Sequence, residues 1–202
     1  QDGQVWLLDE HLQRLDAACR HFGYAPLAAE GIAELRALRH SHARGAYKLR
    51  LTLSRQGAAH IEAQPLADTP VPLRVALARE PIASSDSEFL RHKTTRRELY
   101  APFAPEAGCF DTLLWNARGE LTEFVNGNLA LCLDGRWLTP ALDAGLLPGT
   151  YRARLLAGGG LQTARLVLDD LRRAGAAAFF NSVRGWLAVD LRSLMDRLPP
   201  QE

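Results

Sequence analysis

The alternation of apolar and polar residues predicts two helices and a hairpin in the first third of the chain. Apolar residues recur at steps of three and four over residues 11–22, and more weakly over residues 30–42, which is the period of an amphipathic helix. The period changes to two over residues 47–54, as in a half-buried strand. Residues 55–57 then predict a turn into a second strand near residues 58–63.

Short strands and short helices alternate through the rest of the chain. The apolar runs predict strands at residues 73–77, 111–115, 121–125, 128–133, 136–138, 161–168 and 177–181. Helices are expected at residues 95–100, 151–157, 169–174 and 190–198. Asp134-Gly135 is typical of a two-residue hairpin turn, because both residues tolerate positive φ.

These elements indicate an α+β or α/β chain in two lobes. Residues 81–87 are small and polar after a proline, which favours a linker. We therefore expect a small α/β lobe over residues 1–84 and a larger lobe over residues 85–202.

Composition excludes several classes of protein. The chain has 202 residues, of which 47% are hydrophobic and 23% charged, as in an ordinary globular protein. The net charge is +1, so no basic excess indicates nucleic-acid binding. No run of 18 apolar residues predicts a membrane span, and the first residues lack the features of a secretory signal.

The cysteine and histidine content argues against a disulfide framework and against a metal site. Cys19, Cys109 and Cys132 are odd in number and far apart, so we expect free thiols and a cytoplasmic location. The pair His40 and His42 lacks further ligands nearby and is more typical of a solvated helix end than of a metal site.

Two residues in the second half are candidates for catalysis. Lys93 lies among cations in His92-Lys93-Thr94-Thr95-Arg96-Arg97, and a lysine flanked by cations can be a neutral nucleophile. Glu123 follows a predicted strand and could hold a proton on a ring nitrogen. Taken alone, the first pattern also fits a basic surface cluster and the second an exposed acid at the end of a strand.

Two further segments could bind an anion. Leu147-Pro148-Gly149-Thr150-Tyr151-Arg152 leads into a predicted helix, whose first N–H groups form an anion site. Asn181-Ser182-Val183-Arg184-Gly185-Trp186 places polar side chains at the end of an apolar strand, where ligands commonly bind. Each segment alone also fits a plain loop or turn.

Taken in order, these segments resemble the class IV (fold type IV) pyridoxal-phosphate enzymes. The matching motifs are His11-x-x-Arg14-Leu15, the Lys93 segment, Thr122-Glu123 with Asn128, Leu147-Pro148-Gly149 and Asn181-Ser182-Val183-Arg184-Gly185. The sequences of these motifs are most similar to those of the 4-amino-4-deoxychorismate lyases, especially the form fused behind aminodeoxychorismate synthase component I. The resemblance implies the fold of the D-amino acid aminotransferases, with a barrel-like sheet in the larger lobe, and a homodimer.

The resemblance assigns two residues to the chemistry of pyridoxal 5′-phosphate. Lys93 corresponds to the lysine that attaches to the cofactor and then moves protons. Glu123 corresponds to the acid that keeps the pyridine nitrogen protonated, which makes the ring an electron acceptor.

Further residues are assigned to cofactor binding by the same resemblance. Arg14 matches an arginine that reaches the cofactor phosphate. Thr150 and Tyr151 occupy positions whose backbone N–H groups hold that phosphate, and Ser182 matches a hydroxyl donor to it. Arg97 sits where the family places a side chain near the ring hydroxyl.

The chain departs from the family pattern at three points. Arg96 replaces an asparagine, and Phe124 with Val125 replaces small hydroxyl residues expected beneath the ring. The family also carries a strand upstream of the position of Gln1, so the small lobe is expected to lack its first strand. The chain could thus be part of a longer fusion with aminodeoxychorismate synthase.

The resemblance implies a lyase that converts 4-amino-4-deoxychorismate to 4-aminobenzoate and pyruvate in folate synthesis. One alternative is a class IV aminotransferase acting on branched-chain or D-amino acids. The other is a cofactor-free lobe that retains the fold without the chemistry. Arg50 and Arg91 are candidates for the substrate carboxylate, although both also fit plain surface charges.

Overall fold

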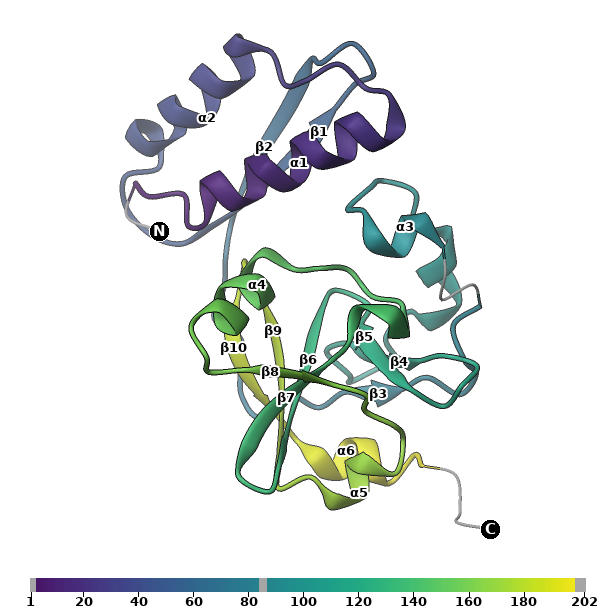
Figure 1. Cartoon of the computed structure of the whole chain (residues 1–202). Coiled ribbons are helices and arrows are strands. Elements are labelled where there is room, and N and C mark those ends of the chain that lie inside the picture. Colours follow the sequence, from purple (N-terminus) through teal and green to yellow (C-terminus); the bar gives the residue numbers. More distant parts are fainter. Residues whose placement is uncertain (1–2, 84–86, 199–202) are drawn as a thin grey trace. The chain divides into compact units, whose positions relative to one another are not determined.

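A computed structural model describes residues 3–83 and 87–198 and divides the chain into two units, Gln1–Thr69 and Pro70–Glu202 (Figure 1). The boundary expected between residues 84 and 85 lies outside the described residues. The division falls earlier because residues 70–83 pair with the second unit. The N–H of Leu73, for example, donates to the carbonyl of Ala188.

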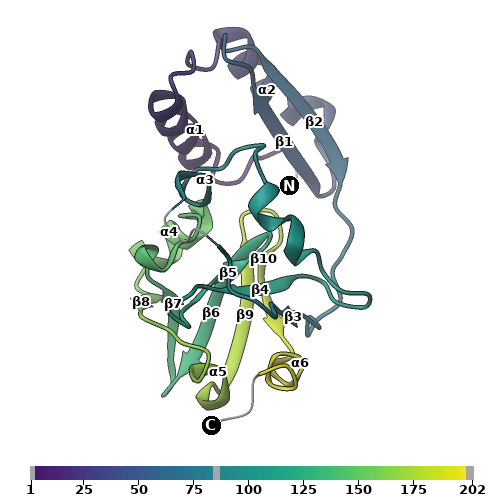
Figure 2. The same cartoon turned by 90° about the vertical axis from the view of Figure 1, so that its right-hand side faces the viewer.

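The first unit contains the two helices and the hairpin that the periodicity predicts. They are α1 (Leu8–Phe22), α2 (Ala29–Ser41), β1 (Tyr47–Leu53) and β2 (Ala59–Pro65). The strands pair antiparallel, with Tyr47 opposite Pro65, and the polar Lys48 and Arg50 of β1 are exposed. Both helices lie on one face of the hairpin (Figures 1 and 2), which explains the apolar stripe on each helix.

The second unit is built on one mixed sheet of eight strands. These are β3 (Ala76–Leu77), β4 (Thr112–Trp115), β5 (Leu121–Phe124), β6 (Gly127–Leu133), β7 (Arg136–Pro140), β8 (Gln162–Ala164), β9 (Ala176–Asn181) and β10 (Gly185–Val189). The order is β10-β9-β6-β5-β4-β3, and β7 pairs with both β6 and β8. A bridge between Leu73 and Val189 joins the chain before β3 to β10, so the sheet closes on itself like a barrel.

Short helices cover the sheet. They are α3 (Glu88–Arg91), the 3₁₀ helices η1 (Glu98–Phe103) and η2 (Leu142–Ala144), α4 (Thr150–Ala157), α5 (Asp170–Arg173) and α6 (Leu191–Met195). The helix expected at residues 95–100 is therefore wrong in its bounds and type. It begins three residues later and includes Pro102. The sequence places residues 181–186 in a polar turn and predicts no strand after it, whereas the structure has strand β10 there.

The central strands are buried on both faces. Leu129, Leu131 and Phe179 belong to the main core, which Leu171 of α5 and Leu194 of α6 complete. The alternate residues Ala130, Ala178 and Phe180 face the other side, where Tyr151 and Leu155 of α4 pack on them. Because both faces are covered, the strands are apolar throughout rather than alternating.

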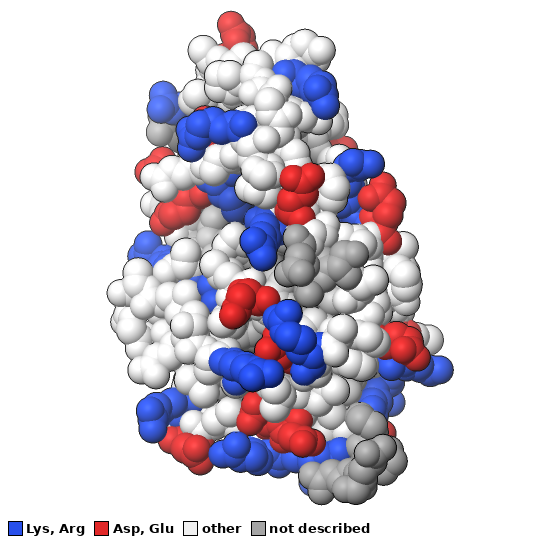
Figure 3. Space-filling view, turned by 45° about the vertical axis from the view of Figure 1, so that its right-hand side comes forward, with Lys and Arg blue, Asp and Glu red and all other residues white. Residues whose placement is uncertain are grey.

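One face of the molecule carries charges of both signs. On the face drawn in Figure 3, basic and acidic side chains are interspersed among the described residues. Within the described ranges, no helix has the length and apolar content needed to cross a membrane.

We expect a close backbone approach in the first unit to make Gly57 irreplaceable. Gly57 has a φ of 86°, and a Cβ there would lie 2.4 Å from the carbonyl oxygen of Pro26. Gly23 has a similar φ of 67°, but nothing lies within 4 Å of its position. Gly23→Ala should cost about 1–2 kcal/mol for the left-handed backbone alone, and Gly57→Ala clearly more. Urea unfolding followed by circular dichroism measures both, and equal losses would contradict the expectation.

Candidate active site

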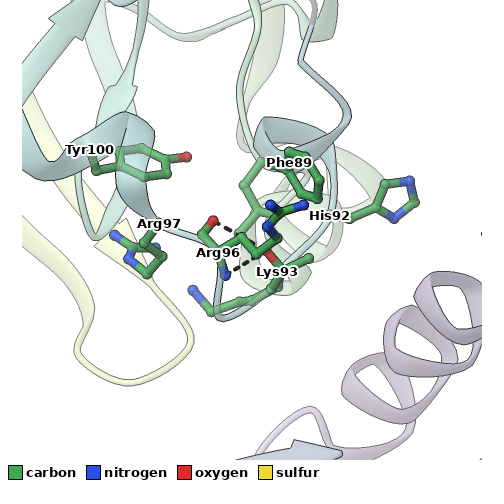
Figure 4. A pocket seen from close by; sticks show the side chains of 8 residues that line it. Phe89, His92, Lys93, Arg96, Arg97 and Tyr100 are labelled. Carbon is green, nitrogen blue, oxygen red and sulfur yellow. Dashed lines mark hydrogen bonds between the residues drawn. The ribbon is translucent and has the colours of Figure 1, made fainter. Parts of the chain in front are cut away.

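Lys93 lies in the segment between α3 and η1, on the wall of a pocket in the second unit. The other residues that line it are Phe89, His92, Thr94, Arg96, Arg97, Tyr100 and Leu147. The Lys93 side chain extends on the side of the segment where Arg97 lies, whereas His92 points away (Figure 4). The pocket therefore combines Lys93 with two arginines.

A local turn fixes the backbone directly after Lys93. The hydroxyl of Thr94 accepts a hydrogen bond from the N–H of Arg96 at 3.2 Å and donates to the carbonyl of Arg96 at 3.3 Å (Figure 4). Arg96, one of the departures from the family pattern, is exposed and places its guanidinium 4.9 Å from the ring centre of Phe89. This cation–π contact keeps the positive charge of Arg96 at the rim of the pocket.

Glu123 is a buried acid and not an exposed residue at the end of a strand. Its residue surface is only 4% exposed. The hydroxyl of Tyr100 donates to Oε1 at 2.8 Å, and the backbone N–H of Leu147 donates to Oε2 at 3.1 Å. Each carboxyl oxygen thus has a donor, as a buried carboxylate requires.

A β-bulge turns Glu123 out of the core. Leu113 of β4 pairs with Phe124, but Trp115 pairs with Leu121. An advance of two residues along β4 therefore matches an advance of three residues along β5. Leu121 and Phe124 consequently both join the main core although they are three residues apart. Bulges redirect side chains beside functional sites, and here the bulge leaves Glu123 facing Tyr100.

The same geometry corrects the expectation for Phe124. Its side chain is fully buried and packs against Phe179, with the ring centres 5.4 Å apart. Phe124 therefore fills the core and does not replace a residue beneath the ring of a cofactor.

The environment of Glu123 disfavours a bare negative charge. Burial raises the pKa of Glu123 to about 8, although the hydrogen bonds from Tyr100 and Leu147 and the charges of Lys93 and Arg97 act in the opposite direction. A carboxyl that has lost its water gains most from a cationic N–H partner. A protonated ring nitrogen is such a partner.

Asn128 connects Glu123 with the segment that begins α4. It lies opposite Glu123 in the β5–β6 pair and donates from Nδ2 to the carbonyl of Leu147 at 3.0 Å. Gly149 approaches so closely that a Cβ there would be 2.2 Å from Oδ1 of Asn128. The residues predicted to bind the phosphate, Thr150 and Tyr151, form the first turn of α4, where backbone N–H groups point out of the helix end.

Hydrogen bonds also join the Lys93 segment and the β9–β10 turn to the end of β5. Arg97 donates from Nη2 to the carbonyl of Val125 at 2.8 Å, and Asn181 donates to the carbonyl of Asn126 at 2.9 Å. The side-chain oxygen of Asn181 accepts the N–H groups of residues 183 and 184, and this shapes the turn that carries Ser182. Lys93, Glu123, Thr150, Tyr151 and Ser182 therefore gather at one end of the sheet.

The assigned roles in cofactor binding stay predictions for every residue, Arg14 and Arg97 included. Arg14 lies on α1 in the first unit, with Nη2 3.3 Å from Nδ1 of His11, and its contact with a phosphate is not tested. Arg97 places its guanidinium 4.4 Å from the ring centre of Tyr100. Its place near a cofactor hydroxyl is likewise untested.

The sequence interpretation assigned no role to Tyr100 or to the backbone of Leu147. Tyr100 is 23 positions from its partner Glu123, and Leu147 acts through its N–H, so neither has a motif of its own. Asn128 was noted in the motif but not as a binding residue. Its position opposite Glu123, in the two consecutive strands predicted at residues 121–125 and 128–133, could have indicated that it lies beside the site.

The donor set fits pyridoxal phosphate. A lysine can attach to its aldehyde, a buried acid can pair with its ring nitrogen, and a helix N-terminus built on a required glycine can hold its phosphate. No cluster of three metal-ligating side chains occurs in the part of the chain that the structure describes.

Comparisons with known proteins identify relatives of this chain. A protein of Schizosaccharomyces pombe named "Putative aminodeoxychorismate lyase" is 29% identical over 192 residues, which cover 91% of this chain and 83% of that protein. A crystal structure named "Putative amino-acid aminotransferase" from Mesorhizobium loti is 36% identical, with a TM-score of 0.82 and 91% of each chain covered. The 4-amino-4-deoxychorismate lyase of Pseudomonas aeruginosa shares the fold at 23% identity, with a TM-score of 0.71, over 98% of this chain and 86% of that one.

These similarities confirm the expected fold class, since the matched structures share the mixed α/β architecture over nearly the whole chain. The family profile described as "Amino-transferase class IV" matches residues 1–191. The chain therefore belongs to the class IV aminotransferase family.

Proposed function

We propose that this chain is a lyase that uses pyridoxal phosphate to convert 4-amino-4-deoxychorismate to 4-aminobenzoate and pyruvate. Class IV aminotransferases and their relatives are enzymes that depend on pyridoxal phosphate, and the family membership extends to nearly the whole chain. The observation that carries the proposal is that Lys93 and the buried Glu123, whose charges interact, lie at one end of the sheet beside the start of α4.

The roles follow from the positions of the residues. Pyridoxal phosphate, when bound, supplies an aldehyde for the substrate amine and a ring that accepts an electron pair. Glu123 would hold the proton on the ring nitrogen through its carboxylate. Thr150 and Tyr151 at the start of α4, with Ser182, would bind the phosphate and so orient the ring.

Lys93 is the residue on this chain that would move the proton. Its Nζ would take a proton from the substrate carbon next to the amine, as a general base. The enolpyruvyl C–O bond then breaks, the ring becomes aromatic, and the leaving group takes up a proton as pyruvate. Substrate and the two products balance without any co-reactant.

The charge of the pocket supports a substrate with two carboxylates. Lys93, Arg96 and Arg97 line it, and its described lining residues include no carboxylate. The name of the S. pombe relative supports the same substrate. Arg96, at the rim over Phe89, is the best placed of these cations to meet a substrate carboxylate.

The 36% identical structure from M. loti favours a second candidate, an amino-acid aminotransferase. The same residues would then move an amino group to a keto acid. The two candidates differ in whether a keto acceptor is required.

Product analysis tests the proposal. The protein, loaded with pyridoxal phosphate, should release 4-aminobenzoate and pyruvate from 4-amino-4-deoxychorismate without an added keto acid. Lys93→Ala should abolish this release while the fold is retained, and borohydride reduction of the loaded wild-type protein should label Lys93 in a peptide map. Amino-group transfer that requires a keto acid would decide for the aminotransferase, and a label on another lysine would contradict the role of Lys93.

Glu123→Gln should slow turnover about a hundredfold, because the amide keeps the shape but not the charge that holds the ring proton. The cofactor-free protein gives an independent readout. The folded-state pKa of Glu123 is raised to about 8 from its ordinary 4.5, so its protonated form stabilises the fold below pH 4.5 and this contribution is lost as pH rises through 8. Wild-type stability should therefore fall relative to Glu123→Gln across this window.

The exposed Glu98 supplies the control for that variant, and Glu98→Gln should change neither turnover nor the pH dependence. Stability curves that run parallel for wild type and Glu123→Gln would show that Glu123 is not the buried acid described above.

Gly149→Ala should weaken cofactor binding about tenfold, because the new Cβ would displace Asn128 and cost the hydrogen bond that positions Leu147. Gly160→Ala is the matched control, since nothing lies within 4 Å of that position. Titration of the cofactor-free proteins with pyridoxal phosphate measures both affinities. Equal affinity of the two variants would exclude Gly149 from the cofactor site.

A further inference from the structure

Tyr100 is a buried residue of η1, in the helix that follows the Lys93 segment. It is 8% exposed, and its ring packs in a core cluster with Ile82, Leu90 and Leu114. The ring also lies on the wall of the pocket, and the hydroxyl reaches Oε1 of Glu123 at 2.8 Å. The apolar contacts hold the ring, so the hydroxyl has little freedom to leave the carboxyl.

The surroundings of the Tyr100 hydroxyl favour its protonated form, which can donate to Glu123. Burial, together with the neighbouring Glu123, raises the pKa of Tyr100 far above its ordinary range. The guanidinium of Arg97, 4.4 Å from the ring centre, acts in the opposite direction but does not outweigh them. Because the phenol keeps its proton, it favours the charged form of the carboxyl that accepts it.

Three other charges act on Glu123 from two elements. Lys93 and Arg97 act on it from the segment before η1, and Arg152 acts from α4. Arg152 is itself buried and donates from Nη2 to the carbonyl of Pro140 at 2.8 Å. These are longer-range charges, whereas Tyr100 supplies a hydrogen bond from a side chain that a single substitution can remove.

We propose that Tyr100 is a positioning residue that acts through Glu123. Its hydroxyl donates to Oε1, favours the charged form of the carboxyl group and fixes the direction of that group, while the Leu147 N–H does the same at Oε2. Tyr100 also connects η1, which follows the Lys93 segment, to Glu123 on β5. This hydrogen bond helps to fix the position of Lys93 relative to the Glu123 carboxyl group. This inference rests on the role of Glu123 in the proposed function.

Tyr100→Phe tests the inference in the cofactor-free protein. With ¹³C-labelled glutamate, the carboxyl signal that disappears in Glu123→Gln identifies Glu123, and its titration midpoint can be followed by NMR. Loss of a hydrogen bond to a charged group should raise the midpoint by about one to two pH units. A Tyr100→Phe protein with the wild-type midpoint would overturn the inference.

A matched control separates this effect from the general loss of a hydroxyl. Tyr24→Phe removes a phenol in the first unit and should leave the Glu123 midpoint unchanged. In the loaded protein, Tyr100→Phe should lower kcat with little change in KM, and Tyr24→Phe should change neither. A purely structural role for Tyr100 predicts lower stability with the pH midpoint of Glu123 unmoved, and that result would also overturn the inference.

A second substitution covers the case in which Tyr100→Phe does not fold. Replacing Tyr100 with 3-fluorotyrosine keeps ring and hydroxyl and makes the phenol a stronger donor, so the Glu123 midpoint should move to lower pH. An unchanged midpoint would contradict the inference. These titrations need neither cofactor nor substrate, so they test Tyr100 even if the protein fails to release pyruvate. Failure of the Tyr100 inference can therefore be distinguished from failure of the proposed lyase function.

Discussion

The burial of one carboxyl group at the end of the sheet is the constraint on which the candidate site depends. A carboxylate removed from water must be met by donors, and Glu123 obtains them from η1 and from the loop before α4. The bulge in β5 makes this possible, since it turns Glu123 toward the donors while its neighbour Phe124 remains in the core. The elements that meet Glu123 are the same ones that bring Lys93 and the start of α4 to this end of the sheet.

The closed sheet holds the loops around Glu123 in place. Strands β6 and β9 are covered on both faces, by the main core and by α4, and they carry Asn128 and Asn181 at the edge of the site. Their side-chain amides reach the backbone of Leu147 and Asn126. Loops that would otherwise be mobile are thus tied to strands, which is the arrangement that functional sites require.

Much of the fold could be predicted from periodicity, because the helices of the first unit, its hairpin and the Asp134-Gly135 turn each depend on local sequence. The turn shows this directly, since Asp134 and Gly135 both have positive φ. The site was predictable only through ordered motifs, as for Lys93 and Glu123. Tyr100 and Leu147 could not be found in this way, because one acts across 23 positions and the other through its backbone. The bulge in β5 could not be predicted for a similar reason, because the register of a strand depends on its partner strand.

The backbone of Leu147 has a consequence for how this family can vary. Its N–H serves Glu123 and its carbonyl serves Asn128, so the position contributes through atoms that nearly all amino acids share. This contact alone therefore does not constrain the identity of the side chain, apart from excluding proline, which has no N–H to donate. A survey of residue types across relatives would thus undervalue position 147, although its backbone connects Glu123 with Asn128.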